Sequence, residues 1–162
     1  MSSQRRATQS ALTPGYAIEP AQPSDLATIR ELLRQAHFDT RGLNAAHFMV
    51  VRAPDGWVLG GAQIKPVGWA RVLSSVVLDT AYRRHGLGRV LVAALLASET
   101  GQVLLMCAGR LIPYYQAFGF EVVSPRRAPW GLFWRWAVLA LIGHLVPSEA
   151  GAVIMARPAS PS

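Results

Sequence analysis

The sequence contains a single cysteine, Cys107, among its 162 residues. A lone cysteine excludes an internal disulfide framework and any metal site built from several cysteines. Cys107 ends the apolar run 103–107, and this position predicts a buried, unreactive thiol. We therefore expect neither a fold stabilised by disulfides nor a resident metal ion.

Acidic residues are also scarce. The chain has 9 Asp and Glu against 16 Lys and Arg, and its formal net charge is +7. Such a balance raises nucleic-acid binding as one interpretation. However, the arginines are scattered along the chain and no long basic run or basic helix face is present. They are adjacent in only three pairs, which are Arg5–Arg6, Arg83–Arg84 and Arg126–Arg127. A polyanionic cofactor accounts for the central pair more economically than a nucleic acid does.

No apolar run is long enough to predict a membrane span. As a helix, the apolar segment 130–146 would extend about 26 Å, short of the roughly 30 Å of a bilayer's hydrocarbon core. Its large aromatic residues would form an unusually large apolar patch if left in water. They are Trp130, Phe133, Trp134 and Trp136. We expect a helix inserted before the last strand that covers an apolar surface of the same chain or of a second copy in a homodimer. Contact with a membrane interface is the alternative.

The N-terminal segment lacks the apolar core of a signal peptide. We expect residues 1–14 to be a disordered leader, residues 15–157 to form one domain, and residues 158–162 to be a loose tail. The length fits a single domain, and 51% hydrophobic residues indicate a globular chain. A cytoplasmic location is the corresponding expectation.

Apolar periodicity and turn residues predict an α/β fold with a mixed sheet and helices packed on it. Asp55-Gly56 is typical of a hairpin turn, and Gly60-Gly61 predicts a bulge or a close approach of two backbones. The expected strands are 16–20, 48–52, 57–64, 69–78, 103–107, 121–123 and 152–155, and the expected helices are 24–36, 87–97, 113–118 and 130–146.

The central stretch 76–91 combines an apolar strand, a basic loop with two glycines, and the start of an apolar helix. The first amides of a helix have no intrahelical acceptor, and the helix dipole adds positive potential there. Gly86 and Gly88 let the backbone approach a ligand closely. Arg83, Arg84 and Arg89 add charge suited to phosphate. This stretch therefore predicts an anion cradle.

Two common phosphate-binding motifs are missing from the cradle. Leu91 stands where the dinucleotide fingerprint requires a third glycine. The Gly-Lys-Ser/Thr of a P-loop is absent, since the only lysine, Lys65, lies upstream. The pattern that remains is Arg83-x-x-Gly86-x-Gly88.

This loop resembles the acyl-CoA pyrophosphate loop of the GNAT acyltransferase superfamily. Downstream, the segment 114–121 reads Tyr-Tyr-Gln-Ala-Phe-Gly-Phe-Glu and is similar to the family's aromatic-Tyr-x-x-x-Gly-Phe segment. The two motifs occur in the family's order with a predicted strand between them. The resemblance extends over about residues 16–157 and is motif-specific over 69–121. It implies a GNAT-like, mixed but mostly antiparallel sheet flanked by helices, with strands splayed at the CoA site.

The resemblance also implies an activity and its residues. The expected reaction is transfer of an acetyl group from acetyl-CoA to a primary amine of a small molecule, an amino acid or a peptide, by direct attack. Tyr115 corresponds to the family's general acid, and the backbone of 76–78 to the strand end that bonds the pantetheine arm. The implied cofactor-binding residues are Val76, Val77, Leu78, Arg83, Arg84, His85, Gly86, Leu87, Gly88 and Arg89.

The chain departs from the family pattern at two positions. Many members carry a glutamate on the strand before the loop, whereas residues 72–75 read Val-Leu-Ser-Ser. Ala108 stands where an asparagine often contacts the CoA arm. The general base is therefore unassigned, and the open candidates are His37, Asp39, His47 and Glu121. The segment 37–47 is either an ordinary loop or a lid over the acceptor. The missing acid keeps a second function open, namely a non-catalytic acyl-CoA-binding sensor or scaffold.

Overall fold

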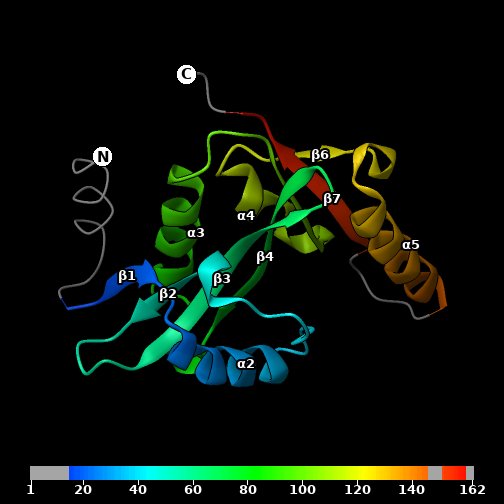
Figure 1. The fold of residues 1–162 in the computed structure, drawn as a ribbon. Coiled ribbons are helices and arrows are strands. Elements are labelled where there is room, and N and C mark those ends of the chain that lie inside the picture. The colour runs from blue at the N-terminus through cyan, green and yellow to red at the C-terminus, as the bar shows by residue number, and fades with distance from the viewer. Residues whose placement is uncertain (1–14, 146–150, 160–162) are drawn as a thin grey trace. The chain divides into compact units, whose positions relative to one another are not determined.

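The computed structural model describes residues 15–145 and 151–159, so the predicted leader 1–14 lies outside the described residues, as does Val146. The described strands form a seven-stranded sheet in the order β1-β2-β3-β4-β5-β7-β6 (Figure 1). The strands are β1 (Ala17–Pro20), β2 (Phe48–Arg52), β3 (Val58–Val67), β4 (Ala70–Leu78), β5 (Val103–Ala108), β6 (Glu121–Val123) and β7 (Ala152–Arg157). The helices are α2 (Leu26–Gln35), α3 (Leu87–Ala97), α4 (Ile112–Gln116) and α5 (Trp130–Leu145).

The predicted fold class is confirmed. β4 and β5 pair in parallel, whereas β1 with β2, β2 with β3, β5 with β7 and β6 with β7 are antiparallel. The bounds of α3, β2 and β6 agree with those predicted. Helix α4 ends before its predicted end at Phe118, because the Phe118 N–H bonds the Tyr115 carbonyl and Gly119 takes a left-handed φ of 84°. This turn directs the chain into β6.

The described residues form two compact units, and β3 and β4 each contribute to both. The first unit contains the described residues up to Ile64 together with Ser75–Ser98. Helix α2 buries its apolar stripe against one face of its strands, and Figure 1 shows α3 on the opposite side. The core on the α2 side consists of Ile29, Leu32, Leu33, Phe48, Val50, Val58 and Val77.

The second unit contains Lys65–Ser74 and the described residues from Glu99 onward. Strand β5 pairs with β7 over all six of its residues, whereas its register with β4 covers three residues of each strand. Figure 1 shows α5 running beside β7. The core of this unit consists of Ala70, Val72, Leu104, Leu132, Ile154 and Ala156.

Helix α5 is only partly covered by its own chain. Leu132 is buried, and the Trp136 indole N–H donates a 2.8 Å hydrogen bond to the Ala152 carbonyl. In contrast, Trp130 and Trp134 on the same helix are exposed. The cover expected for this aromatic segment is therefore incomplete within the described residues. No helix among these residues is long and apolar enough to cross a bilayer.

Candidate functional site

The loop after β4 is held by backbone and side-chain hydrogen bonds. The Asp79 N–H donates to the Leu59 carbonyl at 2.7 Å, which keeps the end of β4 beside β3. The Asp79 carboxylate accepts the Ala81 N–H at 2.9 Å and caps the short 3-10 turn Thr80–Tyr82. The chain therefore leaves the sheet in a defined direction before it reaches the glycine-containing segment.

The glycine-containing segment turns sharply into α3. Arg84 has a φ of 67° and Gly86 a φ of 78°, so both adopt the left-handed conformation. Gly86 is the N-cap of α3, and Leu87, the first helical residue, is buried. No heavy atom lies within 4 Å of the position where a Cβ on Gly86 would stand. The first amides of α3 consequently adjoin open space, the arrangement that suits an anion.

The charge around this helix start is strongly positive. Arg83, Arg84, His85 and Arg89 are all exposed. The Arg83 Nε donates to the Leu78 carbonyl at 3.2 Å, which holds that side chain against the strand end. Asp79 is the only acidic residue between 76 and 91, and its carboxylate already accepts a backbone N–H. The exposed arginines and His85 thus give this helix start a charge that suits a polyanion.

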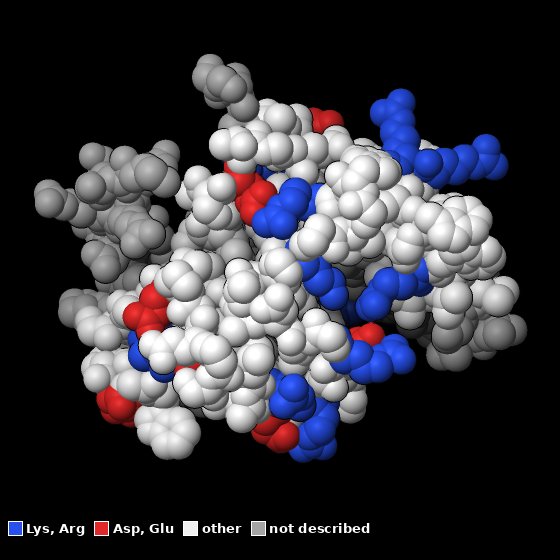
Figure 2. Space-filling model, in the orientation of Figure 1, with Lys and Arg blue, Asp and Glu red and all other residues white. Residues whose placement is uncertain are grey.

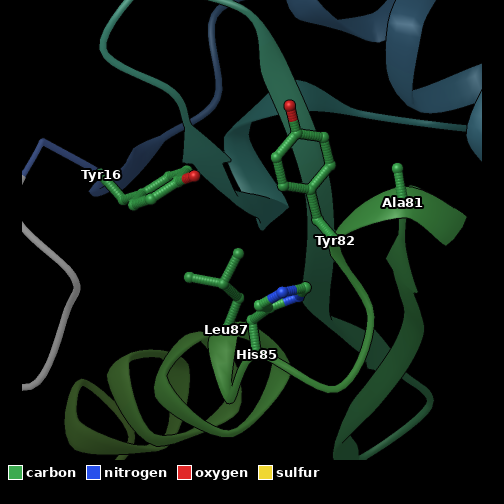
Figure 3. A pocket seen from close by; sticks show the side chains of 5 residues that line it. All are labelled: Tyr16, Ala81, Tyr82, His85 and Leu87. Atoms are coloured by element: carbon green, nitrogen blue, oxygen red, sulfur yellow. The ribbon is translucent and has the colours of Figure 1, made fainter.

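A pocket of about 190 Å³ adjoins this loop within the first unit. Figure 3 shows His85 and Leu87 reaching toward the space that the Tyr16 hydroxyl also faces, with the Tyr82 ring across it. Ala81 completes the lining. Sequence reasoning missed Tyr16, because nothing in the pattern before β1 connects that residue with a loop so much later in the chain.

The end of β4 packs closely on β3. A Cβ on Gly60 would lie 2.5 Å from both the Val77 carbonyl oxygen and the Leu78 Cδ2. Gly60 is therefore required for a close backbone approach, as the Gly60-Gly61 pair predicts. Val77 is buried, whereas Val76 and Leu78 are half-buried. Within this unit, the strand end that leads into the cradle is held by a glycine that leaves no room for a side chain.

A polar pair, Gln63 on β3 and Ser75 on β4, lies close to this strand end. Sequence reasoning did not identify it. Gln63 is 2% exposed, and its Nε2 donates to the Ser75 Oγ at 2.9 Å. Among the residues that the structure describes, none donates a hydrogen bond to the Gln63 Oε1. Ser75 has a φ of 56°, so β4 is distorted at this residue. The available signal was one amide residue within the otherwise apolar run 58–64.

Tyr115 lies on α4 in the second unit and is 8% exposed. Its ring makes edge contacts with the rings of Tyr114 and Phe120, at centroid distances of 5.0 and 6.0 Å. Burial raises the pKa of Tyr115 well above its ordinary value, and the neighbouring Tyr114 and Cys107 raise that pKa further. The hydroxyl is therefore fully protonated near neutral pH. Cys107 is half-buried rather than buried as predicted, and the burial that it has raises the pKa of its thiol.

The structure places all ten predicted cofactor-binding residues in the first unit and Tyr115 in the second. Of the four candidate bases, His37, Asp39 and Glu121 are exposed and His47 is half-buried. Asp39 forms an ion pair with Arg41. The described residues contain no group of three or more His, Cys, Asp or Glu that could hold a metal ion. Burial and geometry therefore do not favour any one of the four as the base.

Four of the arginines outside the cradle are paired with carboxylates. Arg34, Arg41, Arg52 and Arg71 each form an ion pair with a nearby carboxylate. Figure 2 shows acidic side chains lying against basic ones at several places on the face in view. This pairing reduces the uncompensated positive charge that a nucleic-acid backbone could contact outside the cradle.

Comparison with known proteins shows which family these features are similar to. Residues 44–122 match the acetyltransferase (GNAT) domain. None of the curated proteins matches the chain. The fold is similar to that of N-acetylglutamate synthase from Neisseria gonorrhoeae complexed with coenzyme A and N-acetyl-glutamate, with a TM-score of 0.73 and 15% identity. That likeness covers 93% of this chain but 37% of the synthase, so the chain spans little more than a third of that relative.

Two relatives of similar length share the fold. Rv2747 from Mycobacterium tuberculosis, solved in complex with CoA and NLQ, has a TM-score of 0.66 and 19% identity, with 89% of this chain and 99% of that chain covered. The ribosomal-protein-S18-alanine N-acetyltransferase from Escherichia coli has a TM-score of 0.65 and 18% identity, with coverage of 91% and 96%. At these identities the likeness concerns the fold, and the family match over 44–122 includes β4, the glycine-containing loop and α3. Residues 44–122 therefore match the GNAT acetyltransferase domain, and the described fold is similar to that of these acetyltransferases.

Proposed function

We propose that this chain is an acetyl-CoA-dependent N-acetyltransferase that acts on a primary amine. The observation that carries the proposal is the start of α3. Gly86, in the left-handed conformation, is the N-cap of this helix, and the space beside its Cα is open. Exposed arginines lie on both sides of it in the sequence, within the segment that matches the family model. This geometry supports binding of a pyrophosphate, and relatives of the same fold were crystallised with CoA.

The residues of the cradle fit CoA. The amides of Gly86, Leu87 and Gly88 would hold the pyrophosphate oxygens, and Arg83, Arg84 and Arg89 would neutralise its charge, with His85 beside them. Bound acetyl-CoA supplies an acetyl thioester that an amine can attack. Gly86 has a specific task in this arrangement, because a side chain there would occupy the space that the pyrophosphate needs.

The strand end 76–78 would hold the pantetheine arm through its backbone. A strand edge can form such hydrogen bonds only where its neighbouring strand has moved away. The register of β4 with β5 covers Arg71–Leu73 and involves three residues of a nine-residue strand. We propose that the backbone edge of 76–78 is the one that the arm occupies.

Tyr115 would act as the general acid that protonates the departing CoA thiolate. A donor must hold its proton until that moment, and the raised pKa of Tyr115 ensures that it does. The same burial makes the hydroxyl a weaker acid, so the tyrosinate must be short-lived and recover its proton from water. We expect activity to show no loss from Tyr115 ionisation below about pH 10.

The Gln63–Ser75 pair would replace the missing strand acid as an orienting group. The unpartnered Gln63 Oε1 is buried and needs a donor, which an acceptor amine or its water can provide. A neutral amide is too weak a base to take the proton, so the amine would lose it to water. This role differs from that of a carboxylate base and accounts for catalysis without an acid in 72–75.

The first test is isothermal titration of the full chain with CoA and acetyl-CoA. We expect saturable binding, and no binding at millimolar cofactor would remove the proposal. A thiol-release screen would then test free amino acids and peptides with free N-termini as acceptors. Two relatives named above justify this panel, since one was crystallised with N-acetyl-glutamate and the other acetylates an alanine of a ribosomal protein.

The Tyr115→Phe variant tests the mechanism separately from cofactor binding. We expect kcat to fall by at least about 100-fold while CoA affinity is unchanged, because the hydroxyl acts only on the leaving group. The Tyr114→Phe variant is the matched control, and its kcat should stay near that of the parent chain. Equal losses in both variants would show that the aromatic packing matters rather than the Tyr115 hydroxyl.

The absence of an acid in 72–75 supports the second candidate function, a non-catalytic acyl-CoA-binding sensor or scaffold. That function predicts the same CoA titration but no thiol release with any acceptor in the panel. Binding that coincides with turnover on any one amine would exclude it.

A further inference from the structure

Helix α5 and the β3–β4 turn present a set of exposed apolar side chains that acetyl transfer does not use. We call this set the tryptophan face. It consists of Trp69, Trp130, Trp134, Val138 and Leu141, which are between 50% and 71% exposed. The four residues on α5 recur at helical spacing and form one stripe. Large aromatic residues are rarely left together in water without a binding partner.

The turn and the helix belong to one surface of the second unit. A Cβ on Gly68 would lie 3.3 Å from the Pro129 side chain, and a Cβ on Gly131 would lie 3.5 Å from Val67. The β3–β4 turn that carries Trp69 therefore packs against the first residues of α5. On the helix, the Trp130 and Trp134 rings are in edge contact at a centroid distance of 5.4 Å. Two separate elements thus contribute indoles to the same face.

The stretch that leads into and forms α5 carries charge of one sign. Arg126 and Arg127 are exposed immediately before α5, and no described carboxylate forms an ion pair with either. The sequence contains no Asp or Glu between 122 and 145. Figure 2 shows basic side chains projecting beside the uncharged surface at the right of the view, where Figure 1 places α5. An apolar face rimmed by arginines is complementary to an anionic lipid headgroup layer.

We propose that the tryptophan face binds the surface of an anionic lipid bilayer, with α5 lying in the interface. Indole rings favour the headgroup level, because they combine an apolar ring with a polar N–H. At 16 residues α5 would extend about 24 Å, so the helix suits the interface rather than a span. This binding site is independent of the acetyl-transfer proposal.

A second copy of the chain suits this face less well. A two-fold contact brings the same patch of both copies together. Because the stretch 122–145 has no acidic residue, a two-fold contact between these stretches would bring no carboxylate from them to Arg126 and Arg127. Anionic lipid supplies the counter-charge that the stretch 122–145 of a second copy lacks.

Vesicle flotation of the full chain tests the proposal. We expect the protein to float with vesicles of phosphatidylcholine mixed with phosphatidylglycerol, and to stay largely in the bottom fraction with phosphatidylcholine alone. High salt should weaken the binding, because it screens the arginines. No flotation with anionic vesicles would overturn the proposal, whether sedimentation then shows a monomer or a stable dimer. This test needs no variant and therefore does not depend on the folding of one.

Two pairs of variants then assign the binding to the face. Trp130→Ser with Trp134→Ser should lower the vesicle partition coefficient by at least about tenfold. Trp57→Ser is the matched control, since Trp57 is 68% exposed in the other unit, and the partition coefficient of this variant should not change.

The double variant Arg126→Gln with Arg127→Gln should lower the partition coefficient by roughly 30-fold. Its control, Arg30→Gln with Arg34→Gln on α2, should leave the coefficient unchanged. Equal losses in test and control variants would show a general effect of charge or aromatic content and contradict the site.

Discussion

Helices α3 and α5 are both rich in apolar residues, yet the protein uses them differently. In α3, Leu87, Leu91, Val92, Leu95 and Leu96 are buried, so the apolar stripe and the covered stripe coincide. In α5, Leu132 is buried while Trp130, Trp134, Val138, Leu139 and Leu141 are exposed. An apolar sequence therefore indicates that a helix has apolar surface to bury. It does not indicate whether the same chain buries that surface.

The difference follows from where each helix stands against its sheet. Helix α3 packs on the strands of the first unit and has small alanines on its exposed side, such as Ala93 and Ala97. Helix α5 is apolar nearly all round, and β7 can contact only one side of it. Both helices are rich in apolar residues, but the rest of the chain buries a larger part of the apolar surface of α3 than of α5. The following predictions test that contrast, from the largest expected effect to the smallest.

The Leu91→Ala variant in α3 should show the largest loss. Leu91 is 0% exposed, so truncation leaves a cavity and we expect the free energy of unfolding to fall by about 2–5 kcal/mol. Urea denaturation followed by circular dichroism measures this loss. A cost below about 1 kcal/mol would mean that α3 is not the well-packed member of the pair.

The Gly86→Val variant should separate the function of the α3 start from its stability. A valine at a φ of 78° is strained, and we expect a stability loss of about 1–2 kcal/mol together with a loss of CoA affinity of more than about tenfold. The CoA titration and a denaturation curve measure the two effects.

Gly56→Val is the matched control for this prediction. Gly56 has a φ of 90°, also with nothing within 4 Å of its Cβ position, and it lies in the hairpin turn before β3. The control should show a similar strain but keep the affinity of the parent chain for CoA. Unchanged affinity in Gly86→Val would place the cradle elsewhere.

The Trp136→Phe variant tests a hydrogen bond that attaches α5 to β7. Phenylalanine keeps the ring but removes the N–H that donates to the Ala152 carbonyl, so we expect a loss of about 1 kcal/mol. Trp134→Phe, which changes an exposed ring on the same helix, is the control and should leave the unfolding midpoint in place. A larger loss at Trp134 than at Trp136 would reverse the assigned orientation of α5.

The Leu141→Ala variant should have the smallest effect. Leu141 is 65% exposed, so its removal should change the free energy of unfolding of the lipid-free protein by no more than about 0.5 kcal/mol. Because Leu91→Ala and Leu141→Ala remove the same atoms, the difference between their losses in the free energy of unfolding measures the difference in burial between α3 and α5. A loss comparable to that at Leu91 would show that protein covers this part of α5 in solution.

Sequence patterns located most elements because local signals agree there. The basic loop, its glycines and the following apolar periodicity predicted α3 with its observed bounds, and Asp55-Gly56 marked the hairpin turn. The same patterns could not reveal the Gln63–Ser75 hydrogen bond, since the two residues meet only through the pairing of β3 and β4. They also could not connect Tyr16 with the pocket beside His85.

Periodicity and turn chemistry were sufficient to predict the order of strands and helices, because these depend on residues close together in the chain. The resemblance to the family rested on two local motifs, and the anion cradle stays a prediction. Tertiary structure alone decided which side of α5 is covered, how deeply Tyr115 is buried, and that the Gln63 carbonyl oxygen lacks a partner. Those properties arise where distant segments pack, and burial then sets both the pKa of a hydroxyl and the cost of an unpaired polar atom.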